Sequence, residues 1–337
     1  MKAIGYQQSL PIEDERSLQD IELDQPTAQG RDILVTVKAI SVNPVDYKIR
    51  HRMAPEEGEW KVLGWDATGV VEAVGSDVQN FKPGDEVYYA GDLTRPGTNS
   101  EYHLVDERIV GRKPTSLGFA EAAALPLTTL TAWEMLFDRL DVNRPTAQGE
   151  DMILIIGGAG GVGSITIQLL RALTDMTIIA TASRPETQAW VQECGAHYVV
   201  NHRKPLAPQV AALEIGAPGF VFSTTQTDQH YNDIIELIAP QGRFGLIDDP
   251  AELSVLPLKA KAVSLHWELM FTRSMFNTPD IEAQSKLLNE VAALVDAGRI
   301  RSTATEVAGK IDAATLRAVH AKIESGTAHG KIVLEGF

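Results

Sequence analysis

The sequence predicts an α/β protein in which a strand-rich N-terminal unit of the β-barrel type precedes a unit with a doubly wound parallel sheet. Three observations support this prediction. Residues 1–112 contain short β-type runs separated by Pro and Gly turns. From residue 150 the pattern alternates between strand and helix. A glycine-rich turn joins the first strand of that alternation to its first helix, which is the context that a nucleotide-binding motif requires.

The N-terminal unit is predicted from β-branched and aromatic runs too short to be helices. Helices are expected only after Ser116, where Leu117–Leu125 is rich in alanine and Thr128–Leu140 follows Pro126. The expected strands are Met1–Tyr6, Ile33–Val42, Thr68–Val74, Glu86–Ala90 and Glu101–Val105.

The second unit is predicted from five successive strand–helix steps, a pattern that specifies a parallel sheet with helices on both faces. Its strands are expected at Met152–Ile156, Thr177–Thr181, His197–Asn201, Gly219–Thr224 and Arg243–Ile247. A further apolar strand, Ala262–Glu268, is expected to complete this sheet or to extend its edge. Helices are expected at Val162–Leu173, Glu186–Cys194, Ala207–Glu214 and Asp228–Ala239.

The C-terminal segments are expected to return to the first unit, because the nucleotide-binding sheet is already complete before them. Helix Ile281–Ala297 has one apolar face. Strand Ala304–Ala308, helix Ala313–Glu324 and strand Lys331–Glu335 follow. We therefore expect a first domain at 1–125 completed by 300–337, a nucleotide-binding domain at 126–270, and a helical connection at 271–299.

Composition limits the classes of function. The chain has 337 residues, 44 % of them hydrophobic, and a formal net charge of −15, which argues against nucleic acid or an anionic membrane as a partner. No apolar run reaches membrane-spanning length, and the N-terminus lacks a signal-peptide core, so a cytoplasmic location is expected. The single cysteine, Cys194, permits no internal disulfide and no cysteine-based zinc cluster.

The glycine-rich stretch Asp151–Ser164 contains G-x-G-x-x-G at Gly158, Gly160 and Gly163. In this motif the first glycine makes the tight turn, the second lets the backbone approach a pyrophosphate, and the third allows close packing of helix on strand. The N-terminus of the following helix attracts the phosphates. A glycine-rich connector in an unrelated α/β protein is the alternative, and the strand and helix around the motif favour dinucleotide binding.

The end of the second strand favours NADP(H) over NAD(H). NAD-specific sites usually place an acidic residue here, about 20 residues after the turn, to bind the ribose diol. This chain has Ser183 and Arg184 instead, a hydroxyl and a guanidinium that suit a 2′-phosphate. Ser183 with Glu186 also matches a capping box at a helix start, and the two interpretations are compatible.

Joined in chain order, the motifs of both units resemble the medium-chain dehydrogenase/reductase superfamily. Within it the chain is similar to the zinc-independent quinone oxidoreductase branch, ζ-crystallin included, and to bacterial members often labelled a zinc-binding alcohol dehydrogenase family. The resemblance implies a GroES-like catalytic domain, a Rossmann domain, and a nicotinamide in the cleft between them. The segments that carry it are Ser41–Asp46, Gly64–Val71, Val74-Gly75, Phe81–Val87, Ala122–Leu127 and Leu130–Ala132.

The resemblance also predicts that no metal is bound. Zinc-dependent relatives have Cys where this chain has Asn43, His where it has Trp65, and Cys near Leu127. These three residues do not provide the N and S ligands that zinc requires. His51, His103 and Asp66 are the remaining candidates for zinc ligands. The histidines are scattered singly and do not have the spacing of a zinc-binding motif.

The resemblance further implies a set of cofactor contacts. Asn43 would lie beside the nicotinamide, with a turn residue before Pro44 as the alternative. Lys331 would lie near the cofactor, although a solvated lysine is the more economical interpretation. His202 would lean on the adenosine phosphates or remain an ordinary surface histidine. The other expected contacts are Thr131 near the ribose, Gly160, Gly161, Val162 and Gly163 at the pyrophosphate, and Thr224, Gly245 and Ile247 at strand ends.

The expected activity is hydride transfer from NADPH to a quinone or an α,β-unsaturated carbonyl compound, electrophiles that need no metal activation. Lys48 stands where relatives have a Tyr near the substrate, so it interacts with a developing oxyanion or points to solvent. Asp46 and Asp66 are candidate acids, with structural roles favoured. An NADPH-binding sensor or structural protein with little turnover is the alternative, and an alcohol dehydrogenase is disfavoured. Strand Ala262–Glu268, with Trp267, is expected to pair with a second copy and so to form a homodimer. The alternative is that the cluster Trp267–Phe271 forms a wall of the substrate cleft.

Overall fold

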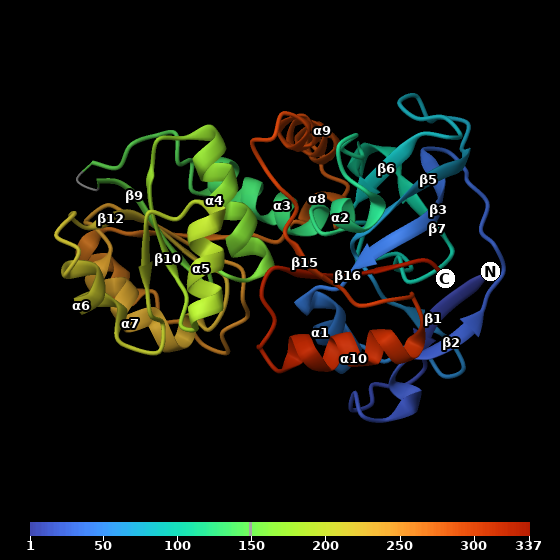
Figure 1. Ribbon diagram of the computed structural model, residues 1–337, viewed down its shortest axis with the longest axis horizontal. Coiled ribbons are helices and arrows are strands. Elements are labelled where there is room, and N and C mark those ends of the chain that lie inside the picture. The colour runs from blue at the N-terminus through green and yellow to red at the C-terminus, as the bar shows by residue number, and fades with distance from the viewer. Residues whose placement is uncertain (148–149) are drawn as a thin grey trace. The chain divides into compact units, whose positions relative to one another are not determined.

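The computed structural model describes residues 1–147 and 150–337 and contains two compact units (Figure 1). Unit 1 comprises Met1–Leu130 and Phe271–Phe337, and unit 2 comprises Thr131–Met270. The first boundary falls within helix α3, Pro126–Trp133, five residues beyond the boundary expected at 125. Segment 271–299 belongs to unit 1. In the described part of the chain, no helix has both the length and the apolar character needed to cross a bilayer.

Unit 1 is built on two sheets. The larger has the strand order β15-β16-β3-β5-β6-β8, and β7 pairs with β3 outside that path. The smaller has the order β2-β1-β4. The long strand β3, Asp32–Ser41, is largely buried and pairs antiparallel with β5, β7 and β16. The remaining strands are β1 Lys2–Tyr6, β2 Gln19–Glu22, β4 Lys61–Val62, β5 Ala67–Val74, β6 Glu86–Tyr89, β7 Tyr102–Asp106, β8 Val110–Arg112, β15 Ala304–Val307 and β16 Lys331–Glu335.

The helices of unit 1 are anchored to these sheets by specific hydrogen bonds. On α9, the carbonyl of Leu288 accepts the Tyr88 hydroxyl at 2.5 Å, and the carboxylate of Asp296 accepts the N–H groups of Thr115 and Ser116 at 3.1 and 2.8 Å. These bonds fix the segment after residue 271 to the strand-rich unit. The helices are α1 Pro44–Arg52, α2 Phe119–Ala123, α8 Thr272–Met275, α9 Ala283–Asp296 and α10 Ala313–Glu324, with short 3₁₀ turns η1 Glu15–Ser17 and η2 Glu107–Ile109.

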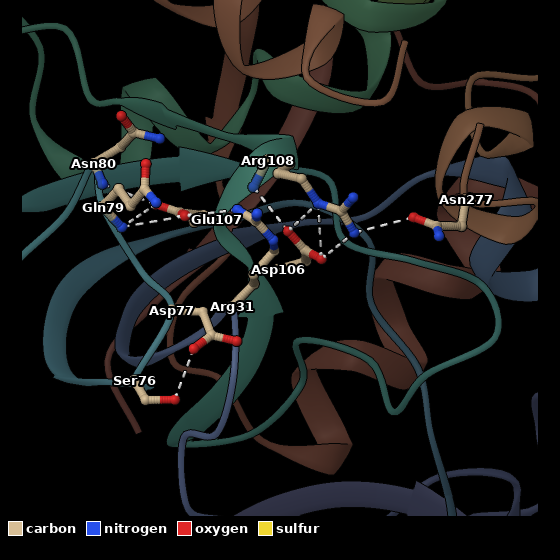
Figure 2. Close-up of polar contacts among 9 residues, drawn as sticks. All are labelled: Arg31, Ser76, Asp77, Gln79, Asn80, Asp106, Glu107, Arg108 and Asn277. Carbon is tan, nitrogen blue, oxygen red and sulfur yellow. Dashed lines mark hydrogen bonds and ion pairs between the residues drawn. The ribbon is translucent and has the colours of Figure 1, made fainter. Parts of the chain in front are cut away.

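A buried carboxylate, that of Glu107, accepts hydrogen bonds from the backbone of a neighbouring loop (Figure 2). Glu107 is 1 % exposed and accepts the backbone N–H groups of Gln79 and Asn80 at 3.0 and 2.8 Å. Next to it, Arg108 donates both to Asp106 and to Asn277, at 2.7 and 3.0 Å. Figure 2 shows that the Asn277 contact joins the end of β7 to the segment after α8. These polar contacts satisfy buried groups and serve the fold.

Unit 2 contains a six-stranded sheet in which every neighbouring pair is parallel. Its order is β11-β10-β9-β12-β13-β14, which in chain order is 3-2-1-4-5-6 and defines the doubly wound dinucleotide-binding fold. Helices α6 and α7 pack on one face through a core that includes Val210 and Ile234, while α4 and α5 pack together beside β10 (Figure 1). The elements are η3 Glu134–Arg139, β9 Glu150–Ile156, α4 Gly161–Leu173, β10 Thr177–Thr181, α5 Pro185–Cys194, β11 Tyr198–Val200, α6 Leu206–Ala211, β12 Pro218–Ser223, α7 Thr227–Leu237, β13 Arg243–Leu246, η4 Leu256–Lys261 and β14 Ser264–Trp267.

The fold class predicted from the sequence is confirmed, with local differences. Helix α1 was not predicted, because Asn43 and Pro44 were interpreted as a turn. Strands β2, β4 and β8 are short and were also missed. The helix expected at Thr128–Leu140 ends as an α-helix at Trp133 and continues as the π-helical turn η3. The strand expected at Ala262–Glu268 forms the edge of the sheet as β14, beside β13.

The turn η3 brings two buried carboxyl groups together with one guanidinium. Glu134 and Glu268 are 1 % and 4 % exposed, and Arg139 Nε lies 2.7 Å from Glu268 Oε2. Burial and the neighbouring Glu134 raise the pKa of Glu268 from 4.5 to about 8. The native state therefore retains a proton that the unfolded chain loses, and stability falls as the pH rises from about 4.5 to about 8.

Glu268→Gln is expected to remove this penalty, because the amide has no charged form to bury. Its melting temperature should exceed that of the unmodified protein, and by more at pH 9 than at pH 6. Glu236→Gln, on the exposed side of α7, is the control and should show no such trend. A Glu268→Gln difference that is independent of pH, measured by thermal unfolding, would contradict the prediction.

Candidate functional site

The glycine-rich turn lies at the carboxyl end of β9. Gly157 is the residue in the left-handed region, with φ of 80°, so the tight turn assigned to Gly158 from the motif falls one residue earlier. Its N–H donates to Thr181 Oγ1 at 2.9 Å, and a Cβ added there would lie 2.3 Å from Thr224 Oγ1. Gly158 packs instead against β10, where a Cβ would meet that of Ala180 at 2.9 Å.

Gly160 and Gly163 occupy the positions that the motif predicts. A Cβ on Gly163 would lie 2.4 Å from the carbonyl oxygen of Gly157, so only glycine permits this packing of helix on turn. Gly160 is the N-cap of α4, and the sole neighbour of an added Cβ there is the Gly157 oxygen at 3.4 Å. The start of α4, with Gly161 and Val162, therefore presents an open helix N-terminus whose first N–H groups have no acceptor within the helix. This cradle fits a pyrophosphate.

Helix α7 shows the contrast. Its N-terminus is occupied by the chain itself, because Asp248 Oδ2 accepts the N–H of Thr227 at 2.9 Å. Thr227 is bonded in turn to Ser223 at 2.8 Å between the two hydroxyl oxygens. The nearby Thr224, expected as a ligand contact, donates its hydroxyl to the Ile156 carbonyl at 2.9 Å and supports the glycine turn. Neither helix has a side-chain hydrogen bond at its N-cap, and in α7 a carboxylate accepts the first N–H of the helix.

The end of β10 differs in part from its prediction. The N-cap of α5 is Arg184, not Ser183, and Thr187 Oγ1 accepts the Arg184 N–H at 3.2 Å, so the expected Ser183–Glu186 capping box is wrong. Glu186 instead lies beside the Arg184 guanidinium, with Nε 3.0 Å from Oε1. Ser183 and Arg184 are both half-buried at this strand end. The guanidinium thus has a carboxylate neighbour that an incoming phosphate must displace or share.

His202 follows β11 and contacts a second histidine. Its ring meets that of His230, on α7, edge to face at 6.5 Å between centroids. Burial first, then His230, Arg203 and Arg184, lower the pKa of His202. Burial also lowers the pKa of His230, against the charges of Asp233 and Asp228. His230 was missed by sequence reasoning, and no local motif singles it out.

The two remaining residues of this sheet that were expected to contact the cofactor, Ile247 and Gly245, have different surroundings. Ile247 lies just past β13, half-buried, at the edge where doubly wound sheets bind ligands. Gly245 lies within β13, and a Cβ there would collide with Met135 Sδ at 2.3 Å. Gly245 is therefore required for the packing of η3 on β13, and its expected contact with the cofactor stays a prediction.

A buried polar network in unit 1 brings together three residues distant in sequence. Asn43, Asp66 and Lys331 are 1 %, 0 % and 4 % exposed. Asn43 Nδ2 donates to Asp66 Oδ2 at 2.7 Å, while Lys331 Nζ donates to Asn43 Oδ1 at 2.5 Å. Lys331 Nζ also lies 3.3 Å from Asp66 Oδ2 and donates to the carbonyl of Val42 at 2.9 Å. Both ends of the Asn43 amide are thereby fixed, and Lys331 is not a solvated lysine.

Burial opposes the charge on each member of this network. It raises the pKa of Asp66 and lowers that of Lys331, and the opposite charge of the partner works against both shifts. Asp46 is also buried and accepts the Asn43 N–H at 2.6 Å at the start of α1. Burial raises the pKa of Asp46 from 3.8 to about 7, so this carboxyl group changes its protonation state near neutral pH.

Two other expected site residues, Lys48 and Thr131, lie on helices α1 and α3. Lys48 is half-buried on α1, one helical turn after Pro44. Thr131 is 5 % exposed, within α3.

The donor set in unit 1 does not fit zinc. At the three positions where zinc-dependent relatives have ligands, the Asn43 amide is bonded to Asp66 and Lys331, and Trp65 donates its indole N–H to the Asp92 carbonyl at 3.2 Å. Leu127 contributes its backbone N–H, which Asp66 Oδ1 accepts at 2.8 Å. These groups lack the nitrogen and thiolate donors of a tetrahedral zinc site.

The two histidines that are candidate zinc ligands, His103 and His51, contact other groups. His103 contacts the Tyr89 hydroxyl at 3.1 Å and the Pro96 carbonyl at 2.9 Å, and His51 lies 3.6 Å from a carboxylate oxygen of Glu324. Among residues 1–147 and 150–337, no group of three or more His, Cys, Asp or Glu side chains is arranged to hold a metal ion.

Known proteins match this chain along its length. Residues 29–133 match the alcohol dehydrogenase GroES-like domain, and residues 194–334 match the zinc-binding dehydrogenase family. The chain is 39 % identical to a zinc-type alcohol dehydrogenase-like protein of Staphylococcus aureus, over 99 % of both chains. Its sequence is 62 % identical to that of a Rhizobium etli protein assigned to the zinc-dependent alcohol dehydrogenases, whose crystal structure is known. The two structures match with a TM-score of 0.98 over 100 % of this chain and 98 % of that one. An Escherichia coli quinone oxidoreductase in complex with NADPH shares the fold at 22 % identity, with a TM-score of 0.82 over all of both chains.

Proposed function

Because the chain belongs to the medium-chain dehydrogenase/reductase superfamily, whose members are oxidoreductases that use a nicotinamide cofactor, we propose that it transfers hydride from NADPH to quinones or α,β-unsaturated carbonyl compounds without a metal ion. The observation that carries the proposal is the open N-cap at Gly160, in a turn where Gly157, Gly158 and Gly163 pack closely against their neighbours. Ser183 and Arg184 at the next strand end, with no acidic residue at that end of β10, favour the 2′-phosphorylated cofactor.

The reaction consumes NADPH, a proton and the acceptor, and yields NADP⁺ and the reduced acceptor. The cofactor supplies the hydride when it is bound. Gly160 and the first turn of α4 would hold the pyrophosphate, and Arg184 would hold the 2′-phosphate. The network of Asn43, Asp66 and Lys331 offers a fixed amide and no metal ligand set, so the acceptor must already be electrophilic. An alcohol hydroxyl would require an activator that this network does not provide.

A steady-state assay with NADPH against quinones, enones and simple alcohols tests this proposal. We expect consumption of NADPH with quinones or enones that survives dialysis against a chelator. Turnover confined to alcohols and abolished by the chelator would contradict it.

A second candidate is an NADPH-binding protein with little turnover. The observation that favours it is the burial of Asn43, Asp46 and Asp66, whose polar groups are committed to one another and to Lys331. Tight binding of NADPH without consumption across the same panel of acceptors would establish this candidate and replace the first.

The edge strand β14 supports a homodimer. It pairs with β13 on one side, and Trp267 at its end is 52 % exposed. An exposed edge with an aromatic residue is suited to pairing with a second copy across a two-fold axis. We expect a dimer by light scattering and partial dissociation of Trp267→Lys, whereas Phe276→Lys, at a residue 72 % exposed in unit 1, should leave the mass unchanged. A monodisperse monomer would contradict this prediction.

A further inference from the structure

The carboxyl ends of β10 and β11 bring a titratable side chain, His202, to the same edge of the sheet as Arg184. The two strands are parallel neighbours with Thr181 opposite Val200, so Ser183 and His202 each lie two residues beyond the same register pair. The Ala182 N–H donates to the Val200 carbonyl at 3.0 Å and continues the pairing into this loop. Arg184 lies close enough for its charge to act on His202. A phosphate held by Ser183 and Arg184 therefore lies within the electrostatic reach of the imidazole.

His202 and His230 form a pair that can hold one proton. Their rings meet at 6.5 Å, His230 is 7 % exposed, and His202 is half-buried. The charged groups that face His202 are Arg203 and Arg184, and those that face His230 are Asp228 and Asp233. Without a bound anion, burial and the two arginines keep the pair neutral near pH 7. Mutual repulsion between two imidazolium rings limits the pair to a single proton.

We propose that the His202–His230 pair takes up a proton when the 2′-phosphate of the cofactor binds, so that affinity and preference for NADPH rise as the pH falls. This inference rests on the proposed use of NADPH. A phosphate dianion beside the pair favours the imidazolium form of His202, and Asp228 and Asp233 favour it from the side of His230. Thermodynamic linkage then requires net uptake of protons on binding, of at most one per site. NADH lacks the 2′-phosphate and should bind without uptake.

Isothermal titration calorimetry at pH 7, in two non-phosphate buffers with different ionisation enthalpies, measures this uptake. We expect net proton uptake with NADPH and none with NADH, and a dissociation constant for NADPH that rises between pH 7 and 8 by up to about tenfold. His202→Asn and His230→Asn should abolish the uptake and flatten the pH dependence. His266→Asn, the same change on β14 at the opposite end of the sheet, should preserve both. The phosphate group ionises near pH 6, and binding of its dianion alone would release protons, which is the opposite sign.

Three outcomes would overturn the inference. If NADPH binds tightly with no proton uptake, the inference fails and the proposed function stands. If NADH produces the same uptake as NADPH, the pair does not respond to the 2′-phosphate and the inference also fails. If neither dinucleotide binds, the proposed function fails and the inference with it.

Discussion

Lys331→Met is expected to destabilise the protein by about 3–5 kcal/mol, the usual cost of removing one partner from a buried ion pair. Lys331 is the cation beside Asp66, with 3.3 Å between Nζ and Oδ2, and neither side chain is more than 4 % exposed. Without it, Asp66 remains buried next to Asp46, and the Oδ1 of Asn43 loses its charged donor. The measurement is the free energy of unfolding in denaturant.

The double variant Asp66→Asn/Lys331→Met should recover much of this loss, because both charges are then absent. The Asn43 amide can reverse, so that its oxygen accepts from the new amide at position 66. Lys286→Met is the matched control, since Lys286 is 78 % exposed and lies 3.9 Å from Glu282 on the surface of α9. Its effect should stay below about 1 kcal/mol. If the effects of the Asp66 and Lys331 changes simply add, the two residues are not energetically coupled.

Gly160→Ala is expected to weaken NADPH binding by about tenfold to a hundredfold, or ~1.4–2.8 kcal/mol, and to leave the melting temperature nearly unchanged. The added methyl group fits the ligand-free protein, with its nearest neighbour 3.4 Å away, and it occupies the space through which a pyrophosphate approaches the start of α4. The dissociation constant, measured by quenching of tryptophan fluorescence or by calorimetry, tests this prediction.

Gly118→Ala provides a control of matched geometry. Gly118 is the N-cap of α2 with φ of −67° and ψ of 168°, close to the −72° and 174° of Gly160. An added Cβ there also meets only one neighbour, Glu121 Oε2 at 3.7 Å. Equal affinity of the two variants for NADPH would show that the cofactor does not approach Gly160.

Elements with a strong local pattern could be predicted from the sequence. The alternation of strand and helix predicted the parallel sheet, and the glycine turn lies where it was expected, between β9 and α4. Helix α1 could also have been predicted, since Asn43 at the N-cap, Pro44 at the first position and Asp46 at the third are start signals. It was missed because the same dipeptide, Asn-Pro, is equally typical of a turn.

The buried network could not be derived in this way. Asn43 and Lys331 are 288 residues apart, and their contact depends on the antiparallel pairing of β16 with β3. Because this contact is long-range, the residues around Lys331 in the sequence do not indicate it. They predict an ordinary surface lysine instead. The packing role of Gly245 was missed for a similar reason: its place in the last part of a strand was predicted, and the η3 turn that packs on it was not.

We propose hydride transfer from NADPH to an electron-poor acceptor without a metal ion. It is tested most directly by following deuterium into an enone product from NADPH that carries deuterium at both C4 positions, because a hydride delivered to the β-carbon is not exchanged with water. Protein stripped with chelator, with its metal content measured, should transfer one carbon-bound deuterium for each NADPH consumed. Transfer that disappears on stripping and returns with added zinc, or consumption of NADPH without deuterium in the product, would contradict the account.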